Sequence, residues 1–252
     1  MHKIFNKTLF IGKKAYYLPT CHSTNDMASV LIANKKPVDG TVIYTDRQTA
    51  GKGQRGNRWE SEAKKNLTFS VLLKVDFIDP SENFFLTLIT SLAIHDLLTE
   101  YLREGLKIKW PNDIVFLNQK IAGILIENYI KQNILEWSVL GIGININQKQ
   151  FSVPTATSLS QLCNQEFDLK EMLELLLQYL ERRYFQLKRQ KYDELKNNYL
   201  ERLYWKDEIH VFRSDQQYFN GRILGVNDSG KLKVETEDGI SLYNFKEIQF
   251  IR

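Results

Sequence analysis

The chain has 252 residues, of which 43% are hydrophobic and 25% are charged, and its formal net charge is +4. This composition predicts a folded protein with one substantial core and excludes a long disordered chain. No apolar run approaches the roughly 20 residues that span a bilayer, and the amino terminus lacks the pattern of a signal peptide, so we expect a cytoplasmic protein without a membrane partner.

Charge and cysteine content narrow the function classes further. The positive charge is modest, and no segment combines dense Lys and Arg with a helix-turn-helix pattern, so we expect no nucleic-acid binding. The two cysteines, Cys21 and Cys163, lie in no metal-ligand pattern. Without a secretory signal they are predicted to be free thiols.

In the first half of the chain, apolar spacing predicts two helices and two buried strands. A short helix follows Asn25, and a strand over residues 40–45 leads into a glycine-rich loop. A second strand covers residues 67–75. A longer helix begins at residues 79–81 and keeps its apolar spacing up to Gly105.

In the second half, short strands are expected at residues 106–110, 121–126 and 137–146, followed by helices at 168–191 and 192–205. Strands joined mostly by short turns predict an α+β fold, with a mixed sheet and helices on one face. From residue 207 the pattern changes to short strands separated by the hairpin signals at Gly230 and Gly239.

The loop over residues 46–60 has the features of an anion-binding loop. Glycines alternate with basic residues in the order Gly51, Lys52, Gly53, Arg55, Gly56, Arg58, and no acid lies between Asp46 and Glu60. Glycines allow positive φ and close approach of the backbone to a ligand, while the cations would neutralise a phosphate.

Three familiar nucleotide loops do not fit this segment. Asn57 and Arg58 stand where a Walker A loop has Lys and then Ser or Thr. A dinucleotide-binding fingerprint opens a helix, whereas the next regular segment here is a predicted strand. The kinase motifs HRD and DFG do not occur in the chain. A plain surface loop therefore remains the alternative.

Four further motifs accompany the loop in a fixed order. They are Ser23-Thr24-Asn25, Lys109-Trp110-Pro111-Asn112-Asp113, the segment KIAGILIE from Lys120, and GIGININ from Gly141. Together they resemble the biotin protein ligases, also called biotin–[acetyl-CoA-carboxylase] ligases. The resemblance implies a class II synthetase-like catalytic domain over residues 1–206 and a small SH3-like β-barrel over 207–252. Because the first motif begins at Ser23, we expect the form without an amino-terminal DNA-binding domain.

The resemblance implies ATP-dependent attachment of biotin to a lysine of a biotin carboxyl carrier protein. Biotinyl-5′-AMP would be the intermediate, Mg²⁺ the cofactor, and pyrophosphate and then AMP the leaving groups. A homodimer is a further family-level expectation. The biotin-binding residues would be Ser23, Thr24, Asn25, Gln48, Gly51, Lys52, Gly53, Gln54, Lys120, Gly123 and Gly143. On residue type alone, Ser-Thr-Asn is also a helix N-cap, and the glycines also suit close strand approach.

Lys120, Lys52 and Arg55 would be the catalytic cations, with Lys120 beside the biotin carboxylate and the α-phosphate. The adenylate-binding residues would be Lys52, Arg55, Asn57, Arg58, Trp59, Lys120 and Asn145. Trp59 offers a stacking surface for adenine and Asn145 a donor and an acceptor for its edge. A solvated Lys120 in a turn and a core Trp59 are the alternatives. Asp113 would hold Mg²⁺ or form an Asx turn after Pro111.

One position departs from the usual family sequence. Gln54 stands where many relatives have an arginine that is expected to retain the adenylate, and a neutral amide lacks a bidentate cationic grip. Our hypothesis is that Lys52 or Arg55 supplies the missing charge, and that the loop is mobile until ligand binds.

Two other functions are compatible with the sequence. A lipoate or octanoate ligase or transferase shares the fold and the acyl-transfer chemistry. A non-catalytic binding protein would use the carboxy-terminal barrel, but this alternative leaves the basic loop and Lys120 without a role.

Overall fold

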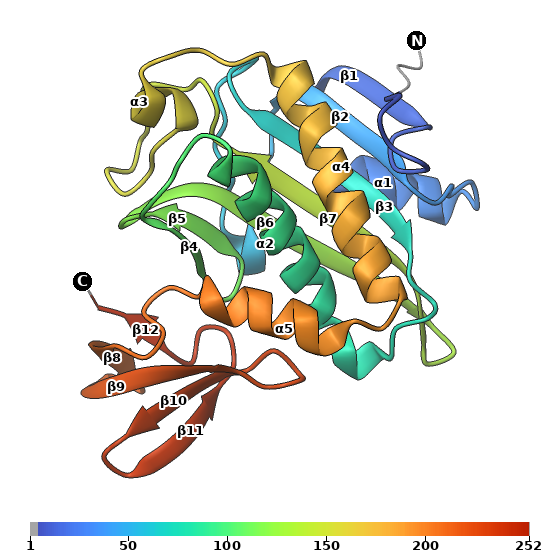
Figure 1. Cartoon of the computed structure of the whole chain (residues 1–252). Coiled ribbons are helices and arrows are strands. Elements are labelled where there is room, and N and C mark those ends of the chain that lie inside the picture. The colour runs from blue at the N-terminus through green and yellow to red at the C-terminus, as the bar shows by residue number, and fades with distance from the viewer. Residues whose placement is uncertain (1–4, 252) are drawn as a thin grey trace.

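A seven-stranded mixed sheet forms the centre of the protein, which we describe from a computed structural model covering residues 5–251 (Figure 1). The strands lie in the order β1-β2-β3-β7-β6-β5-β4. Only β1 and β2 are parallel, and every other neighbouring pair is antiparallel. The strands are β1 (Ala15–Cys21), β2 (Thr41–Gln48), β3 (Leu67–Lys74), β4 (Leu106–Lys109), β5 (Asp113–Phe116), β6 (Gln119–Lys131) and β7 (Ile134–Ile144).

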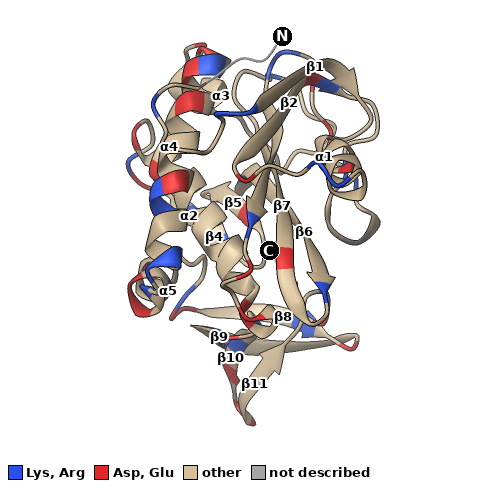
Figure 2. Ribbon diagram, turned by 90° about the vertical axis from the view of Figure 1, so that its right-hand side faces the viewer, with Lys and Arg blue, Asp and Glu red and all other residues tan. Residues whose placement is uncertain are grey.

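The two faces of this sheet pack against different helices. Val71 and Leu73 point into the large core beneath α2 (Phe84–Thr99) and α4 (Leu169–Lys188), whereas Leu72 points to the other face. There it packs in a small cluster with Ala28 of α1 (Thr24–Ala33). This alternation follows from the two-residue period of a strand. Figure 2 shows α1 on the opposite side of the sheet from α2 and α4.

The expectation of helices on one face therefore holds for the large helices, and α1 is the exception. α1 has only 10 residues and contacts β2, β3 and β7. A helix of this length is about 15 Å long, so it covers only part of its face. The rest of that face is available for a ligand site.

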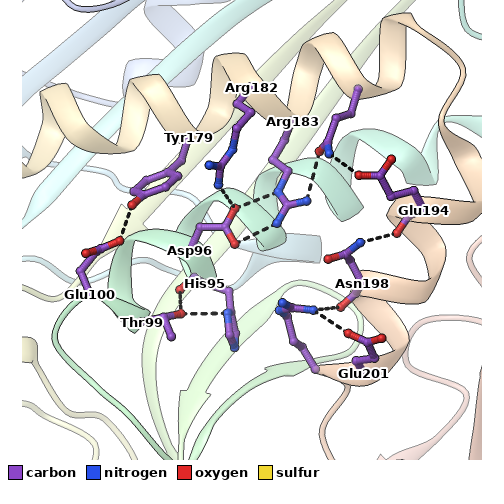
Figure 3. Close-up of polar contacts among 12 residues, drawn as sticks. His95, Asp96, Thr99, Glu100, Tyr179, Arg182, Arg183, Glu194, Asn198 and Glu201 are labelled. Atoms are coloured by element: carbon purple, nitrogen blue, oxygen red, sulfur yellow. Dashed lines mark hydrogen bonds and ion pairs between the residues drawn. The ribbon is translucent and has the colours of Figure 1, made fainter.

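The large helical layer is tied together by a buried ion pair (Figure 3). Asp96 on α2 accepts hydrogen bonds from Arg183 Nε at 2.8 Å and Nη2 at 2.9 Å. Arg183 also donates to Gln186, which in turn donates to Glu194 on α5 (Tyr192–Glu201). These bonds join all three helices to one another.

Several boundaries differ from the expected ones. α2 ends at Thr99 rather than near Gly105, and β1 was not predicted because its exposed positions break the apolar alternation of a buried strand. The short helix α3 (Leu159–Cys163), capped by Ser158, was also not predicted. The predicted start of α4 is confirmed, because the Asp168 carboxylate accepts bonds from the main-chain N–H groups of Lys170 and Glu171.

The last part of the chain forms a separate five-stranded antiparallel sheet. Its order is β11-β10-β9-β8-β12. The expected SH3-like barrel stays a prediction. Gly230 and Gly239 have positive φ values of 81° and 115° in the turns that the sequence indicated. The strands are β8 (Ile209–Ser214), β9 (Gln217–Val226), β10 (Leu232–Thr236), β11 (Gly239–Tyr243) and β12 (Gln249–Phe250).

This second sheet is fixed to the edge of the first near the β4–β5 turn. The buried Trp110 donates from Nε1 to the carbonyl of Gly230 at 2.8 Å, and Lys109 Nζ lies 4.9 Å from the ring centre of Phe250. Lys206 forms an isolated β-bridge with Ile223. The carboxy-terminal strands are therefore held against the central sheet. Within residues 5–251, no helix has the length and apolarity to cross a membrane.

Candidate functional site

A cavity of about 580 Å³ opens on the face of the sheet that α1 covers only in part. Its walls come from the start of α1, the end of β2 with the following loop, the β4–β5 turn, the β6–β7 pair and the carboxy-terminal segment. Fourteen of the predicted site residues line it: Ser23, Thr24, Asn25, Gln48, Lys52, Gly53, Gln54, Asn57, Arg58, Trp59, Asp113, Lys120, Gly123 and Gly143.

Strand pairing explains why segments distant in sequence meet here. β1 and β2 are parallel, so Cys21 pairs with Gln48 and their carboxyl ends lie side by side. The chain then enters α1 directly after β1 and the basic loop directly after β2. Across the sheet, Gly123 of β6 and Gly143 of β7 are direct partners. The Ser-Thr-Asn motif, the loop and the two glycine-containing strands therefore surround one space.

The basic loop folds back on itself rather than extending from the sheet. Gly53 N donates to Asn57 O at 2.7 Å, and Trp59 N donates to Gly51 O at 3.1 Å. A 3₁₀ turn over η1 (Gln54–Gly56) closes the tip. A Cβ on Gly51 would lie 2.4 Å from the Trp59 carbonyl oxygen, so a side chain there would force the two arms of the loop apart. Mobility of the loop before ligand binding stays a prediction.

Trp59 packs against the glycines of the central strands. A Cβ on Gly143 would stand 2.3 Å from the indole ring, and one on Gly123 would stand 3.1 Å from it. Glycine at these positions makes room for the ring, because any larger residue would displace it. The Trp59 Nε1–H group is buried and has no hydrogen-bond partner among the described residues. The indole therefore offers contact area to a ligand, while its buried donor has no partner among the described residues.

Lys120 and Asp113 face each other at the cavity wall. Lys120 Nζ lies 2.6 Å from Asp113 Oδ1 and 5.6 Å from the Trp59 ring centre. The β5–β6 register shifts between Ile114 and Val115, where Lys120 enters the ladder. A bulge of this kind redirects a side chain, so it helps to place the ammonium against the cavity.

Lys52 forms an ion pair with Asp26 at the start of α1. That hydrogen bond raises the pKa of the Lys52 ammonium, and the charge of Glu127 adds to the effect. The two side chains are 48% and 41% exposed, so the pair is worth little net free energy in water. Lys52 stays charged and can exchange Asp26 for an anionic ligand at small cost.

A chain of buried polar groups closes the other end of the cavity. The Thr24 main-chain N–H donates to Gln48 Oε1 at 2.8 Å, and the Ser70 hydroxyl lies 2.7 Å from Thr24 Oγ1 and 2.6 Å from Asn25 Oδ1. Asn25 Nδ2 donates to Glu127 Oε2 at 2.8 Å. Ser23 is the N-cap residue of α1, but its side chain makes no capping bond. This end can therefore meet a neutral, hydrogen-bonding ligand.

Three predicted residues are not placed at the cavity. Gly51 and Asn145 are absent from its lining, and the side chain of Arg55 lies outside the described part of the chain. Asn145 is buried and donates from Nδ2 to Thr157 O at 3.0 Å, so it joins β7 to the segment before α3. The role of Asn145 in reading adenine stays a prediction, as does that of Arg55.

The structure adds cavity residues that sequence reasoning did not assign. Lys109, Trp110, Pro111 and Asn112 belong to a motif that was recognised, although only Asp113 received a role. The carboxy-terminal lining residues had no sequence signal, because an ordinary strand-and-turn pattern gives no indication of packing against another sheet. They are Phe245, Lys246, Ile248, Gln249 and Phe250.

Comparisons of the sequence with known proteins identify a family of ligases. The sequence profile of the biotin/lipoate A/B protein ligase family matches residues 17–145. The bifunctional ligase/repressor BirA of Bacillus subtilis is 30% identical over 93% of this chain and 73% of its own length. The biotin–[acetyl-CoA-carboxylase] ligase of Mycobacterium tuberculosis is 34% identical over 65% of this chain and 61% of its own.

A solved structure with the same fold is similar over almost the whole chain. The biotin protein ligase from Aquifex aeolicus, in complex with biotin and ATP, superimposes with a TM-score of 0.79 and 26% sequence identity. The match covers 95% of this chain and 99% of the other. The similarity therefore includes both the central sheet and the carboxy-terminal sheet.

Proposed function

The chain belongs to the biotin/lipoate A/B protein ligase family, and from this we propose that it attaches biotin to a lysine of a biotin carboxyl carrier protein at the expense of ATP. The observation that carries the proposal is the set of groups that line this one cavity. A polar end, glycines beside an indole ring, and the lysines Lys52 and Lys120 line one volume of about 580 Å³. Biotin and a nucleotide need all three.

In the proposed first step, the biotin carboxylate attacks the α-phosphorus of ATP and expels pyrophosphate, which leaves biotinyl-5′-AMP. Two anions must approach each other, so fixed cations are needed. Lys120 is suited to this role because its ammonium already faces a carboxylate, Asp113, at 2.6 Å. Lys52 is suited to the phosphates because its present partner, Asp26, is exposed and easily replaced.

Asp113 is also the residue that would hold Mg²⁺. Magnesium in nucleotide sites takes one or two carboxylates and completes its coordination with phosphate oxygens and water, so a single carboxylate at the cavity wall fits. When bound, the ion would neutralise charge on the phosphates. Without nucleotide, the chain keeps the Asp113 carboxylate neutralised through Lys120.

The polar end of the cavity favours biotin over lipoate or octanoate. The ureido ring of biotin carries two N–H donors and a carbonyl acceptor, whereas a dithiolane ring or an alkyl chain carries none. An apolar ligand would offer no partner to the polar groups that line this end, such as the Ser23 hydroxyl and the Gln48 amide, and a polar group buried without a partner costs about 1–3 kcal/mol. A lipoyl substrate would therefore bind poorly.

In the second step, an acceptor lysine would attack the carbonyl of the mixed anhydride and release AMP. The lysine belongs to the partner protein. Closing the basic loop over the adenylate would shield the anhydride from water. The homodimer stays an expectation of the family.

The test is incubation of the full chain with ATP, Mg²⁺ and labelled biotin, with and without a carrier domain, followed by separation of adenylate and labelled acceptor. Lys120→Gln should reduce adenylate formation by roughly 100-fold or more, because it removes a cation that stabilises the transition state. Lys170→Gln, on the exposed start of α4, is the matched control and should be unchanged. Full activity of Lys120→Gln, or no product from the native chain, would refute the proposal.

A further inference from the structure

The polar end of the cavity contains a continuous chain of hydrogen bonds that runs away from the ligand site. It starts at Thr24 and passes through Ser70 and Asn25 to the carboxylate of Glu127. Thr24 and Asn25 line the cavity, whereas Ser70 and Glu127 do not. Ser70 is fully buried, and Thr24 and Asn25 are each 3% exposed. No solvent molecule is therefore needed to complete this chain.

Glu127 determines the orientation of the Asn25 amide. A carboxylate can only accept hydrogen bonds, and so can the Leu125 carbonyl, which lies 3.4 Å from Asn25 Nδ2. If the amide were turned over, its oxygen would face two acceptors. Glu127 therefore holds Nδ2 toward itself and leaves Oδ1 pointing at Ser70.

The position of Asn25 Oδ1 then determines both hydroxyl protons. The contacts from Ser70 Oγ to Asn25 Oδ1 at 2.6 Å and to Thr24 Oγ1 at 2.7 Å are each too short for two oxygens without a proton between them. Asn25 Oδ1 carries no proton, so Ser70 must donate to it. Ser70 has one proton and gives it to Asn25, so the acceptors within reach of the Thr24 hydroxyl proton are Ser70 Oγ at 2.7 Å and Gln48 Oε1 at 3.2 Å, which both belong to the protein.

We infer that Ser70 and Glu127 are positioning residues that commit the Thr24 hydroxyl to act only as an acceptor toward the ligand. Its proton is directed into the protein, and its lone pairs remain for an N–H donor in the cavity. The inference rests on the proposed function, since it explains how the site selects a cyclic ureide. In a biotin analogue with a ring oxygen in place of that N–H group, the lone pairs of the ring oxygen would face those of Thr24 Oγ1, and the two atoms would repel each other.

The experiment measures binding, so it does not depend on catalysis. Calorimetry with the full chain compares biotin with two cyclic carbamate analogues, each with one ureido N–H replaced by oxygen. The analogue that lacks the N–H group facing the Thr24 hydroxyl should bind the native chain about 30-fold more weakly than biotin. It loses a buried hydrogen bond and leaves the Thr24 acceptor unpaired.

Three variants separate positioning from general damage. Ser70→Ala and Glu127→Leu should each bind biotin about 10-fold more weakly, and the discrimination against that analogue should fall to about 3-fold, because the Thr24 hydroxyl can turn and donate. Glu127→Gln, whose amide oxygen can still accept from Asn25, should retain the native discrimination between biotin and the analogue. Ser138→Ala removes another fully buried serine of the sheet, which donates to Asn128 and not to Asn25. This variant should leave the discrimination between biotin and the analogue at its native value.

The possible outcomes either overturn or support the role of Ser70 and Glu127. Equal binding of biotin and both carbamates to the native chain would overturn the inference, even if the chain makes biotinyl-5′-AMP. Full discrimination in folded Ser70→Ala and Glu127→Leu would also overturn it. Discrimination by the native chain that both variants lose would support the inference even if no adenylate forms, and the proposed reaction alone would then be refuted.

Discussion

At the residue scale, the cavity depends on positions where a side chain is missing. Gly141 and Gly143 lie two residues apart on β7 and so share one face of the strand. A Cβ on Gly141 would lie 2.3 Å from Asn25 Oδ1, whereas a Cβ on Gly143 would lie 2.3 Å from the Trp59 ring. The same strand thus makes room for Asn25 at Gly141 and for the indole ring at Gly143.

These two glycines predict separable defects in the proposed reaction. Gly141→Ala should raise the KM for biotin about 10-fold by displacing Asn25, with a smaller effect on ATP. Gly143→Ala should raise the KM for ATP by a similar factor, because Trp59 must leave its present position. Each variant is the control for the other in steady-state adenylate assays, and identical kinetic changes in both would contradict the assignment of two subsites.

At the element scale, one turn of α2 carries two polar side chains, of which one joins the helix to α4 and the other bonds within the helix (Figure 3). Asp96 binds Arg183 of α4, and the next residue toward the amino terminus, His95, lies in the same turn of α2. His95 Nδ1 is 3.1 Å from Thr99 Oγ1. These groups affect the stability of the helical layer and lie away from the cavity lining.

Asp96→Ala should lower the free energy of unfolding by about 3 kcal/mol, because Arg183, only 7% exposed, would keep a buried charge without its carboxylate. Chemical denaturation measures this change. Glu194→Ala, which removes the exposed end of the same network, should cost less than about 1 kcal/mol. A loss of stability in Asp96→Ala no larger than in Glu194→Ala would show that the pair contributes little.

Burial lowers the pKa of His95 to about 4, and the positive charge of Arg202 adds to the effect. The unfolded chain, with a histidine pKa near 6.5, therefore binds more protons than the native state between pH 6.5 and 4. Stability should be fully present above pH 6.5 and fall by about 3 kcal/mol as the pH drops to 4.

Denaturation at a series of pH values tests this dependence. His95→Asn should remove most of it, while His22→Gln, at an exposed histidine, should leave the slope as in the native chain. An unchanged slope in His95→Asn would mean that other groups cause the acid sensitivity.

At the scale of the whole molecule, the carboxy-terminal sheet completes the cavity wall. Trp110 connects it to the central sheet through its bond to Gly230, which is itself buried. Phe245 and Phe250 follow on the same side and line the cavity. The position of this sheet thus contributes to the shape of the site.

Trp110→Phe should therefore affect both stability and substrate binding. It leaves the Gly230 carbonyl without its partner, which should cost about 1–2 kcal/mol, and it should raise the KM for ATP several-fold while kcat changes little. Trp137→Phe, beneath α1 on the other part of the sheet, is the control for loss of an indole. Equal kinetics in the two variants would argue that the carboxy-terminal sheet does not shape the site.

The sequence by itself determined most of the helices and strands, the α+β class, the free cysteines and the ordered motifs that indicate the family, whereas β1, β5 and α3 were missed. These depend on local periodicity, on glycine and on side-chain chemistry, which are readable along the chain. Residue identity also pointed to fourteen of the positions that line the cavity.

Only the tertiary structure decided the remaining features. The placement of α1 on the opposite face, the Ser70 and Glu127 contacts to Asn25, and the carboxy-terminal wall of the cavity all join segments that are far apart in the chain. Asn25 and Glu127 are separated by 102 positions, and no local pattern encodes such a contact. Strand order and register, which arise from packing of the whole core, bring these groups together.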